Sequence, residues 1–298
     1  MFVIPYLLIV LAIFVLGVLT GGLSNVTSGG AGVLTIYVLV NFASLGLQSS
    51  TGTVLAASAV FVLIGVVTFF RRGQVDLQLG LTVGLSGVAG AFLAARWAST
   101  VDSASLEHVF GGFTLALAFF TSYLFISDWQ KKKNGDKNQL GSKNSQAVDM
   151  KLPISQLQVQ PQISRFSGKT PLALSVQILK GVLIGIATGL FGVGLASLSV
   201  VLFLLLFKLD TKMVLGTSLF ASFFRYAGGS LGYLSTGQIN PIYFLILVVG
   251  GAIGSVIGAR MVLGTGVASK DILIKMVQVV ILLFISYEFL LKFLIFGH

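Results

Sequence analysis

The sequence predicts an all-α polytopic membrane protein made of two inverted-topology repeats of about five helical elements each, with broken or re-entrant helices near the start of each repeat. First, 55% of the 298 residues are hydrophobic and only 9% are charged, and several apolar runs approach the roughly 20 residues that a span needs. Second, the two halves of the chain repeat each other. Third, positively charged loops change places between the halves. The runs are apolar on all faces, which excludes the alternating segments of a transmembrane barrel.

The repeat is marked by glycines that recur in one register. Gly185 follows Gly21 by 164 residues, since 185 minus 21 is 164, and the same offset relates Gly30 to Gly194. A register that holds without gaps over a whole half predicts that the two halves share one fold. Further pairs in this register are Gly17 and Gly181, Gly52-Thr53 and Gly216-Thr217, Gly65 and Gly229, Gly73-Gln74 and Gly237-Gln238, Gly87 and Gly251, Gly90 and Gly254, and Ala95-Arg96 and Ala259-Arg260.

Each half divides into five hydrophobic pieces. The N-terminal piece has no basic residues before its apolar core and takes part in the repeat, so we expect it in the mature protein rather than as a secretory signal. We therefore expect three regions: repeats at 1–127 and 172–298, and a polar linker at 128–171. The pieces are 2–20, 31–43, 51–70, 77–95 and 108–127 in the first half, and 172–191, 195–207, 213–234, 241–262 and 272–295 in the second.

The second piece of each half is too short to span comfortably, and it follows a Gly-rich interruption. These interruptions lie at 21–32 and 185–194. Irregular backbone at membrane depth is tolerated where it is buried in protein or lines a cavity, and transporter sites are often built from paired interruptions. The interruptions are thus predicted to line a permeation path. The alternative is that their glycines only let helices pack closely.

Loop charges predict how the halves are oriented. Arg71 and Arg72 follow the third piece of the first half, whereas Lys208 and Lys212 precede the third piece of the second half. Under the positive-inside rule both loops are cytoplasmic, so equivalent loops face opposite sides and the repeats are inverted. The same rule places the linker in the cytoplasm of a bacterial-type cell (inner) membrane, with both termini outside. The basic residues of the linker are Lys131, Lys132, Lys133, Lys137, Lys143, Lys151, Arg165 and Lys169.

Several partner and activity classes are excluded by composition. The net charge of +10 suggests nucleic acid, but the basic linker and positive-inside topology explain it better, so no nucleic-acid partner is expected. The chain has no cysteine, and its histidines are His108 and His298 alone. Thiol catalysis, Cys-ligated metals and a His metal cluster are therefore absent, and we expect no metal, no cofactor and no enzymatic activity.

Arg225 is the strongest candidate for a functional residue. It stands in the apolar run GTSLFASFFRYAGGSLGYL, and no acidic residue lies within a dozen positions on either side. If this run crosses a bilayer, Arg225 is an uncompensated intramembrane cation. Ser218, Ser222 and Arg225 fall on one helical face, which suits a small anion. The alternative is an arginine that snorkels to a headgroup or donates to buried carbonyls.

These motifs as a set resemble the TauE/SafE family of sulfite exporters. The resemblance covers nearly everything except the linker. It implies a duplicated membrane fold and export of sulfite, sulfoacetate or another organosulfonate. The family motifs in this chain are the glycine breaks Gly30 to Gly32 and Gly189 to Gly194, Gly52-Thr53 and Gly216-Thr217-Ser218, the turns Gly73-Gln74-Val75 and Gly237-Gln238-Ile239, and Gly87/Gly90 with Arg96 and Gly251/Gly254 with Arg260.

An anion near the midplane needs fixed hydrogen-bond donors, and the sequence offers a set of them. Arg96 and Arg260 end equivalent helices on opposite faces and are candidates for gating or attracting the anion. Because the membrane potential is negative inside, an anion can leave downhill without a coupling ion. The predicted substrate-binding residues are Arg225, Asn25, Ser28, Gly30, Thr53, Gly194, Thr217, Ser218 and Ser222.

Two readings use the same residues. One is a secondary transporter that exports a sulfur oxyanion. The other is a passive anion channel, or a permease for another small carboxylate-like or sulfate-like anion. Single-channel conductance or a flux that does not saturate would favour the channel. The expected partners are the small anion, the lipid bilayer and, as an open possibility, further copies of the chain.

Overall fold

The computed structural model describes residues 3–27, 32–116, 118–119, 122–123, 171–192, 211–264 and 287. All regular structure in these residues is helical, which confirms the all-α class. Residues 103–116 form a helix in addition to the labelled ones. The labelled helices are α1 (Val3–Thr27), α2 (Gly32–Phe42), α3 (Leu47–Arg71), α4 (Leu77–Ala98), α6 (Pro171–Phe191), α8 (Thr211–Leu234) and α9 (Pro241–Gly264).

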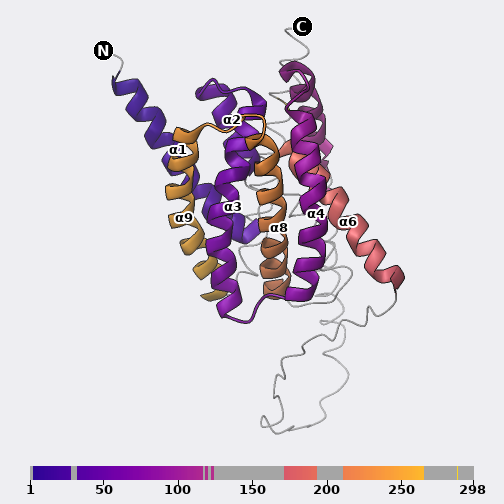
Figure 1. Cartoon of the computed structure of the whole chain (residues 1–298). Coiled ribbons are helices and arrows are strands. Elements are labelled where there is room, and N and C mark those ends of the chain that lie inside the picture. Colours follow the sequence, from indigo (N-terminus) through magenta and orange to yellow (C-terminus); the bar gives the residue numbers. More distant parts are fainter. Residues whose placement is uncertain are drawn as a thin grey trace, which may run out of the picture.

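Five of the described helices are long and apolar enough to cross a membrane, and the crossing segments lie in α1, α3, α4, α6 and α9. Their outer faces expose large apolar side chains such as Leu85, Leu93 and Ile253, as expected where lipid replaces water. Helix α8 is as long as these but is not apolar enough by composition. Figure 1 shows α8 between α3 and α4, so the most polar of the long described helices lies inside the bundle.

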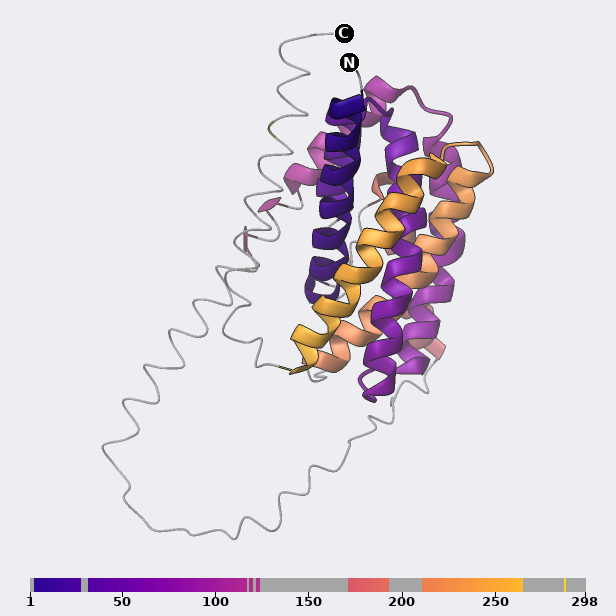
Figure 2. The same ribbon diagram turned by 90° about the vertical axis from the view of Figure 1, so that its left-hand side faces the viewer.

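Equivalent helices make equivalent contacts. Helix α1 packs along α9, and its counterpart α6 packs along α4, while α3 and α8 contact each other between these pairs (Figures 1 and 2). The loop from α3 to α4 lies at one end of the bundle and the loop from α8 to α9 at the other (Figure 1). Inverted repeats predict this arrangement. Which end faces the cytoplasm stays a prediction.

The two loops begin with the same glycine turn. Gly73 has a φ of 67° and Gly237 a φ of 74°, a left-handed conformation that residues with a Cβ rarely adopt. The next residue in each loop, Gln74 or Gln238, donates its N–H to a carbonyl in the last turn of the preceding helix. The turn is the glycine-ended stop expected after a helix, and it explains why this glycine recurs in both halves.

In the structure, helices extend into the Gly-rich segments 21–32 and 185–194 that were predicted to be interruptions. Helix α1 continues through Gly21 to Thr27, and α6 continues through Gly185 to Phe191. The prediction was wrong at these glycines because they serve helix packing. A Cβ at Gly21 would collide with the backbone of Gly251 in α9, and a Cβ at Gly185 with the backbone of Gly87 in α4. Helix α6 ends at Phe191, and the next residue, Gly192, has a left-handed φ of 58°.

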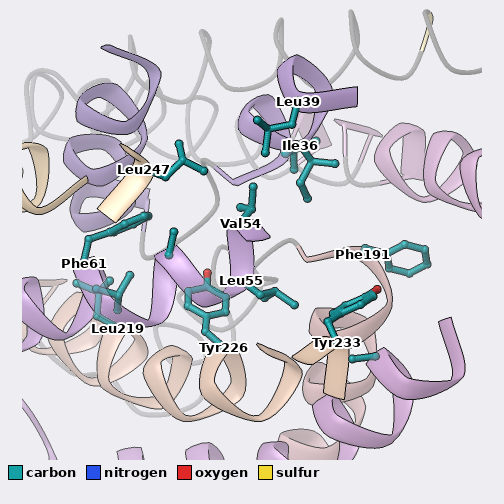
Figure 3. Packing of buried hydrophobic residues seen from close by; sticks show 14 of the residues in the cluster. Ile36, Leu39, Val54, Leu55, Phe61, Phe191, Leu219, Tyr226, Tyr233 and Leu247 are labelled. Atoms are coloured by element: carbon teal, nitrogen blue, oxygen red, sulfur yellow. The ribbon is translucent and has the colours of Figure 1, made fainter. Parts of the chain in front are cut away.

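The core between α2, α3 and α8 fills the centre of the bundle. Figure 3 shows Ile36 and Leu39 of α2 above Val54 of α3, with Tyr226 and Tyr233 of α8 on the other side. The predicted pieces 195–207 and 272–295, apart from Tyr287, and the linker 128–171, apart from Pro171, lie outside the described residues.

Candidate functional site

Arg225 lies inside the bundle, in the second half of α8. Its exposed fraction is 0%, and its Nη2 donates to the Ser222 hydroxyl at 2.7 Å. Ser218 is also buried, one turn before Ser222 on the same face. The structure thus brings together the three residues that the helical spacing groups. A fully buried side chain does not fit an arginine that snorkels to a lipid headgroup.

The aliphatic part of Arg225 packs where α4 and α6 meet α8. A Cβ placed on Gly87 would lie 2.7 Å from Arg225 Cγ, 2.9 Å from Cδ and 2.9 Å from the carbonyl oxygen of Gly181. The glycine therefore leaves the space that the arginine stem occupies. A charge held at such a position costs free energy unless something in the site or a ligand compensates it.

Thr53 and Thr217 each hydrogen-bond to a loop between two helices, and they do not lie together in one binding site. Thr53 Oγ1 accepts the N–H of Asn240 at 2.9 Å and donates to the carbonyl of Ser49 at 2.6 Å. Thr217 Oγ1 accepts the N–H of Asp76 at 2.9 Å. Asn240 and Asp76 belong to the two loops at opposite ends of the bundle (Figure 1). The structure therefore does not bring these two hydroxyls together.

The glycine beside each of these threonines makes the same loop contact. A Cβ at Gly52 would collide with the backbone of Gln238, and a Cβ at Gly216 with the backbone of Gln74. Each half thus holds the loop of the other half with a Gly-Thr pair. The Gly-Thr pair and the Gly-Gln turn are separate motifs in the sequence. In the structure the Gly-Thr pair of each half contacts the loop with the Gly-Gln turn of the other half.

Asn25 bridges α1 and α9. Its Nδ2 donates to the carbonyl of Gly21 at 2.9 Å, the carbonyl of Ser255 at 3.1 Å and the Ser255 hydroxyl at 2.9 Å. Gly189 and Ala91 occupy the equivalent positions and pack closely without a hydrogen bond between side chains. The Nδ2 of Asn25 is therefore used by helix packing, whereas its Oδ1 is buried and has no hydrogen-bond partner among the described residues. A role of Asn25 toward a substrate stays a prediction.

The described ends of the two interruptions meet each other. The carbonyl oxygen of Gly192, just after α6, lies 3.3 Å from a Cβ placed on Gly32, the first residue of α2. Broken elements from both halves therefore adjoin at this point, which we call the junction. Ser28, Gly30 and Gly194 lie outside the described residues, and their role in the path stays a prediction.

Arg96 and Arg260 are exposed near the C-terminal ends of α4 and α9. Since α4 and α9 start from loops at opposite ends of the bundle, these arginines lie at opposite ends too (Figure 1). Their predicted role in gating or attracting the anion stays a prediction.

Sequence reasoning missed three buried hydroxyls near the junction, those of Ser50, Thr51 and Tyr233. All three side chains have an exposed fraction of 0%, and the hydroxyl oxygens have no hydrogen-bond partner among the described residues. The repeat contains a signal that would have found them, because each position is apolar in the other half. The equivalent residues are Val214, Leu215 and Phe69.

Comparisons with known proteins agree with the membrane bundle. The family model "Sulfite exporter TauE/SafE" matches residues 13–289. The probable membrane transporter protein YdhB of Bacillus subtilis (strain 168) is 23% identical over 254 residues, which cover 85% of this chain and 89% of the relative. The probable membrane transporter protein YunE of the same organism is 24% identical over 254 residues, which cover 83% and 86%. No solved structure matches the chain.

Proposed function

Because the chain belongs to the sulfite exporter TauE/SafE family and is a multi-pass membrane transporter, we propose that it exports a small sulfur oxyanion, namely sulfite, sulfoacetate or another organosulfonate. The transport step changes no covalent bond of the substrate, so the protein acts without enzymatic chemistry. The exporter lies in the inner membrane of a bacterial cell, with repeats 1–127 and 172–298 joined by a cytoplasmic linker.

The observation that supports an anionic substrate is the burial of Arg225 inside a membrane bundle. A guanidinium stays protonated at any accessible pH, and it can meet two oxygens of a sulfonate or sulfite at once. The Ser222 hydroxyl accepts a hydrogen bond from Nη2 of Arg225, and its O–H is a donor for an anion oxygen. A bound oxyanion thus supplies the negative charge that this part of α8 lacks.

The membrane potential favours export as the direction of transport for an anion. Moving one negative charge outward across 100 mV, negative inside, is favourable by about 2.3 kcal/mol. Uniport therefore suffices for export of an anion, without a coupled ion.

The test is a thermal-unfolding panel on the purified protein with sulfite, sulfoacetate, taurine, isethionate, sulfate and acetate. An anion that binds the folded state raises the unfolding temperature. We expect at least one sulfur oxyanion to do so in the parent. In Arg225→Met its affinity falls by at least about tenfold, equal to about 1.4 kcal/mol, the scale of one charge-assisted hydrogen bond. Arg225→Lys restores affinity only in part, because an ammonium keeps the charge but loses the planar fork.

The matched control is Arg71→Met, which removes an exposed arginine without a proposed role toward the anion and leaves binding at Arg225 in place. Binding of the same anion by Arg225→Met at parental affinity would refute the assignment of Arg225. Single-channel conductance in a planar bilayer would replace the exporter with a passive anion channel.

A further inference from the structure

Three buried hydroxyls of this protein are used neither by the fold nor by the site at Arg225. Ser50 and Thr51 of α3 and Tyr233 of α8 are fully buried, and their hydroxyl oxygens have no hydrogen-bond partner among the residues that the structure describes. Buried polar groups are nearly always hydrogen-bonded, because leaving one unsatisfied costs free energy. Three such groups in one structure therefore need an explanation.

The usual way to satisfy a helical hydroxyl is available but not taken. Thr20 donates to the carbonyl of Leu16 at 2.7 Å, Thr53 to Ser49 at 2.6 Å and Thr188 to Ile184 at 2.8 Å, in each case one turn earlier in the same helix. Ser50 and Thr51 are the fourth and fifth residues of α3, so the carbonyls one turn earlier are those of Gly46 and Leu47, and neither hydroxyl bonds to them. Their hydroxyls are thus available to a group that is not part of the helix.

The fold itself does not need these hydroxyls. The equivalent residues of the other half are Val214, Leu215 and Phe69, and all three are buried in equivalent helices. The same packing is therefore achieved with apolar side chains. A polar residue that replaces an apolar one only in one half is better explained by a ligand than by the architecture.

The side chains that carry these hydroxyls lie around the junction of the broken helices. Thr51 Cγ2 is 2.6 Å from a Cβ placed on Gly192, so the Thr51 side chain lies directly against the end of α6. Tyr233 packs its Cβ on Gly52, and Figure 3 shows its hydroxyl directed toward Phe191, the last residue of α6. Both side chains therefore approach the end of α6.

Two further features of the junction favour an anion. Val54 of α3 lies against Gly32 of α2. Ser50 is one turn before Val54 on the same face of α3, so it also faces α2. Helix α2 is described from Gly32 to Phe42, and the N-terminal end of a helix carries a partial positive charge. Hydroxyl donors beside a helix N-terminus match the oxygens of a small oxyanion.

This position is distinct from the Arg225 site. Tyr233 follows Arg225 by eight residues on α8, which corresponds to about 12 Å along a helix. The stem of Arg225 packs against Gly87 of α4, whereas Tyr233 packs against Gly52 of α3, so the two side chains face different helices. An anion held at Arg225 must therefore move along α8 to reach the junction.

We infer that the hydroxyls of Ser50, Thr51 and Tyr233, together with the start of α2, form a second and uncharged binding site for the same small oxyanion that Arg225 binds. This inference rests on the proposed export function. Neutral donors hold an anion less tightly than a guanidinium does. The second site therefore receives the anion from Arg225 and releases it readily, which favours passage over trapping.

The experiment compares the parent with a triple variant, Ser50→Ala, Thr51→Val and Tyr233→Phe, which removes the hydroxyls and keeps the shapes. We expect efflux of sulfite and sulfoacetate from proteoliposomes to fall by at least about tenfold, the effect of losing one or more hydrogen bonds to the anion. The unfolding temperature stays equal or rises, because unsatisfied buried groups have been removed. The shift that the anion produces in that temperature persists, because Arg225 is intact.

Thr68→Val is the matched control, since this hydroxyl is also on α3 and is satisfied by the carbonyl of Ile64 at 3.1 Å. Its efflux should equal that of the parent. Parental efflux by the triple variant would overturn the second site, and so would a lower unfolding temperature, which would mean that the hydroxyls hold the fold. In both cases the parent still binds and exports the anion, so the proposed function stands. A parent that neither binds nor releases any anion of the panel refutes the proposed function and the second site together.

Discussion

Phe61 of α3 and Arg225 of α8 occupy equivalent positions in the two halves and pack against equivalent glycines. A Cβ on Gly251 would lie 2.8 Å from Phe61 Cγ, and one on Gly87 would lie 2.7 Å from Arg225 Cγ. The packing is the same, yet one side chain is apolar and the other charged. The repeat therefore determines where a large side chain packs but not whether that side chain is charged. Packing alone does not explain why an arginine stands at position 225.

The α3–α4 and α8–α9 loops also occupy equivalent positions and differ in the side chains that hold them. At the α8–α9 loop, the Ser49 hydroxyl donates to Gln238 Oε1 at 2.5 Å. At the α3–α4 loop, the equivalent Gln74 Oε1 is buried and has no hydrogen-bond partner among the described residues. Met213 stands where the repeat would place a second Ser49. One loop is thus held by one more hydrogen bond than the other.

The largest effect is expected from a test of the inversion itself, because its outcome is all or none. Arg72 and Thr236 are equivalent exposed residues of the two loops, and the chain is naturally free of cysteine. In Arg72→Cys and Thr236→Cys a membrane-impermeant maleimide should react from opposite sides of oriented vesicles. Labelling of both from one side would contradict the inverted repeat.

A second guanidinium at the apolar position should be strongly destabilising. Phe61→Arg places a charge against Gly251 where no anion site is proposed, and we expect the free energy of unfolding to fall by about 3–5 kcal/mol. Phe61→Met, the control, should cost less than about 1.5 kcal/mol. Denaturant titration measures both. If Phe61→Arg is as stable as the control, this position tolerates a buried charge without an anion. The burial of Arg225 would then no longer support an anionic substrate.

The two glycines that receive these side chains provide a finer test. Gly87→Ala and Gly251→Ala both add a methyl group where there is no room, and each should lower stability by about 1–3 kcal/mol. Only Gly87→Ala displaces the stem of Arg225, so only this variant should also weaken anion binding, as measured by isothermal titration. Equal losses of binding in both variants would show that general packing, and not Arg225, governs affinity.

The smallest effect is expected at the loops. Ser49→Ala removes the donor to Gln238 and should lower the free energy of unfolding by about 1 kcal/mol. Met213→Ser offers Gln74 a donor and should shift stability in the opposite direction by a similar amount. Thermal unfolding of both variants beside the parent measures the difference. A loss of stability in Met213→Ser would mean that the loops differ by more than this one side chain.

The helices could be predicted well from the sequence, because apolar runs, loop charges and the repeat are local or regularly spaced signals. Predicted pieces such as 31–43 and 241–262 agree closely with α2 and α9. The predicted extent of the interruptions was wrong because a glycine can either end a helix or allow close helix packing. It breaks a helix at Gly192, but at Gly21 and Gly185 it lets a helix approach another backbone, and the sequence alone does not distinguish these cases.

The candidate site could be predicted only in part. Ser218, Ser222 and Arg225 lie on one helix, so helical spacing groups them correctly. Thr53 looks like an anion ligand in the sequence, but its hydroxyl accepts an N–H from a residue 187 positions away. Contacts at that separation depend on the tertiary fold. Thr51 was missed for the opposite reason, since nothing local marks a hydroxyl that lacks a partner.

The crossed loop contacts have a consequence for how the protein is made. The N–H of Asp76 is accepted by Thr217, which lies 141 residues later in the chain, and Thr53 accepts from Asn240, which comes later still. A ribosome delivers the N-terminal part first. The first half therefore enters the membrane with its loop and its Gly-Thr pair both unoccupied, and it completes its packing only after the second half has been synthesised.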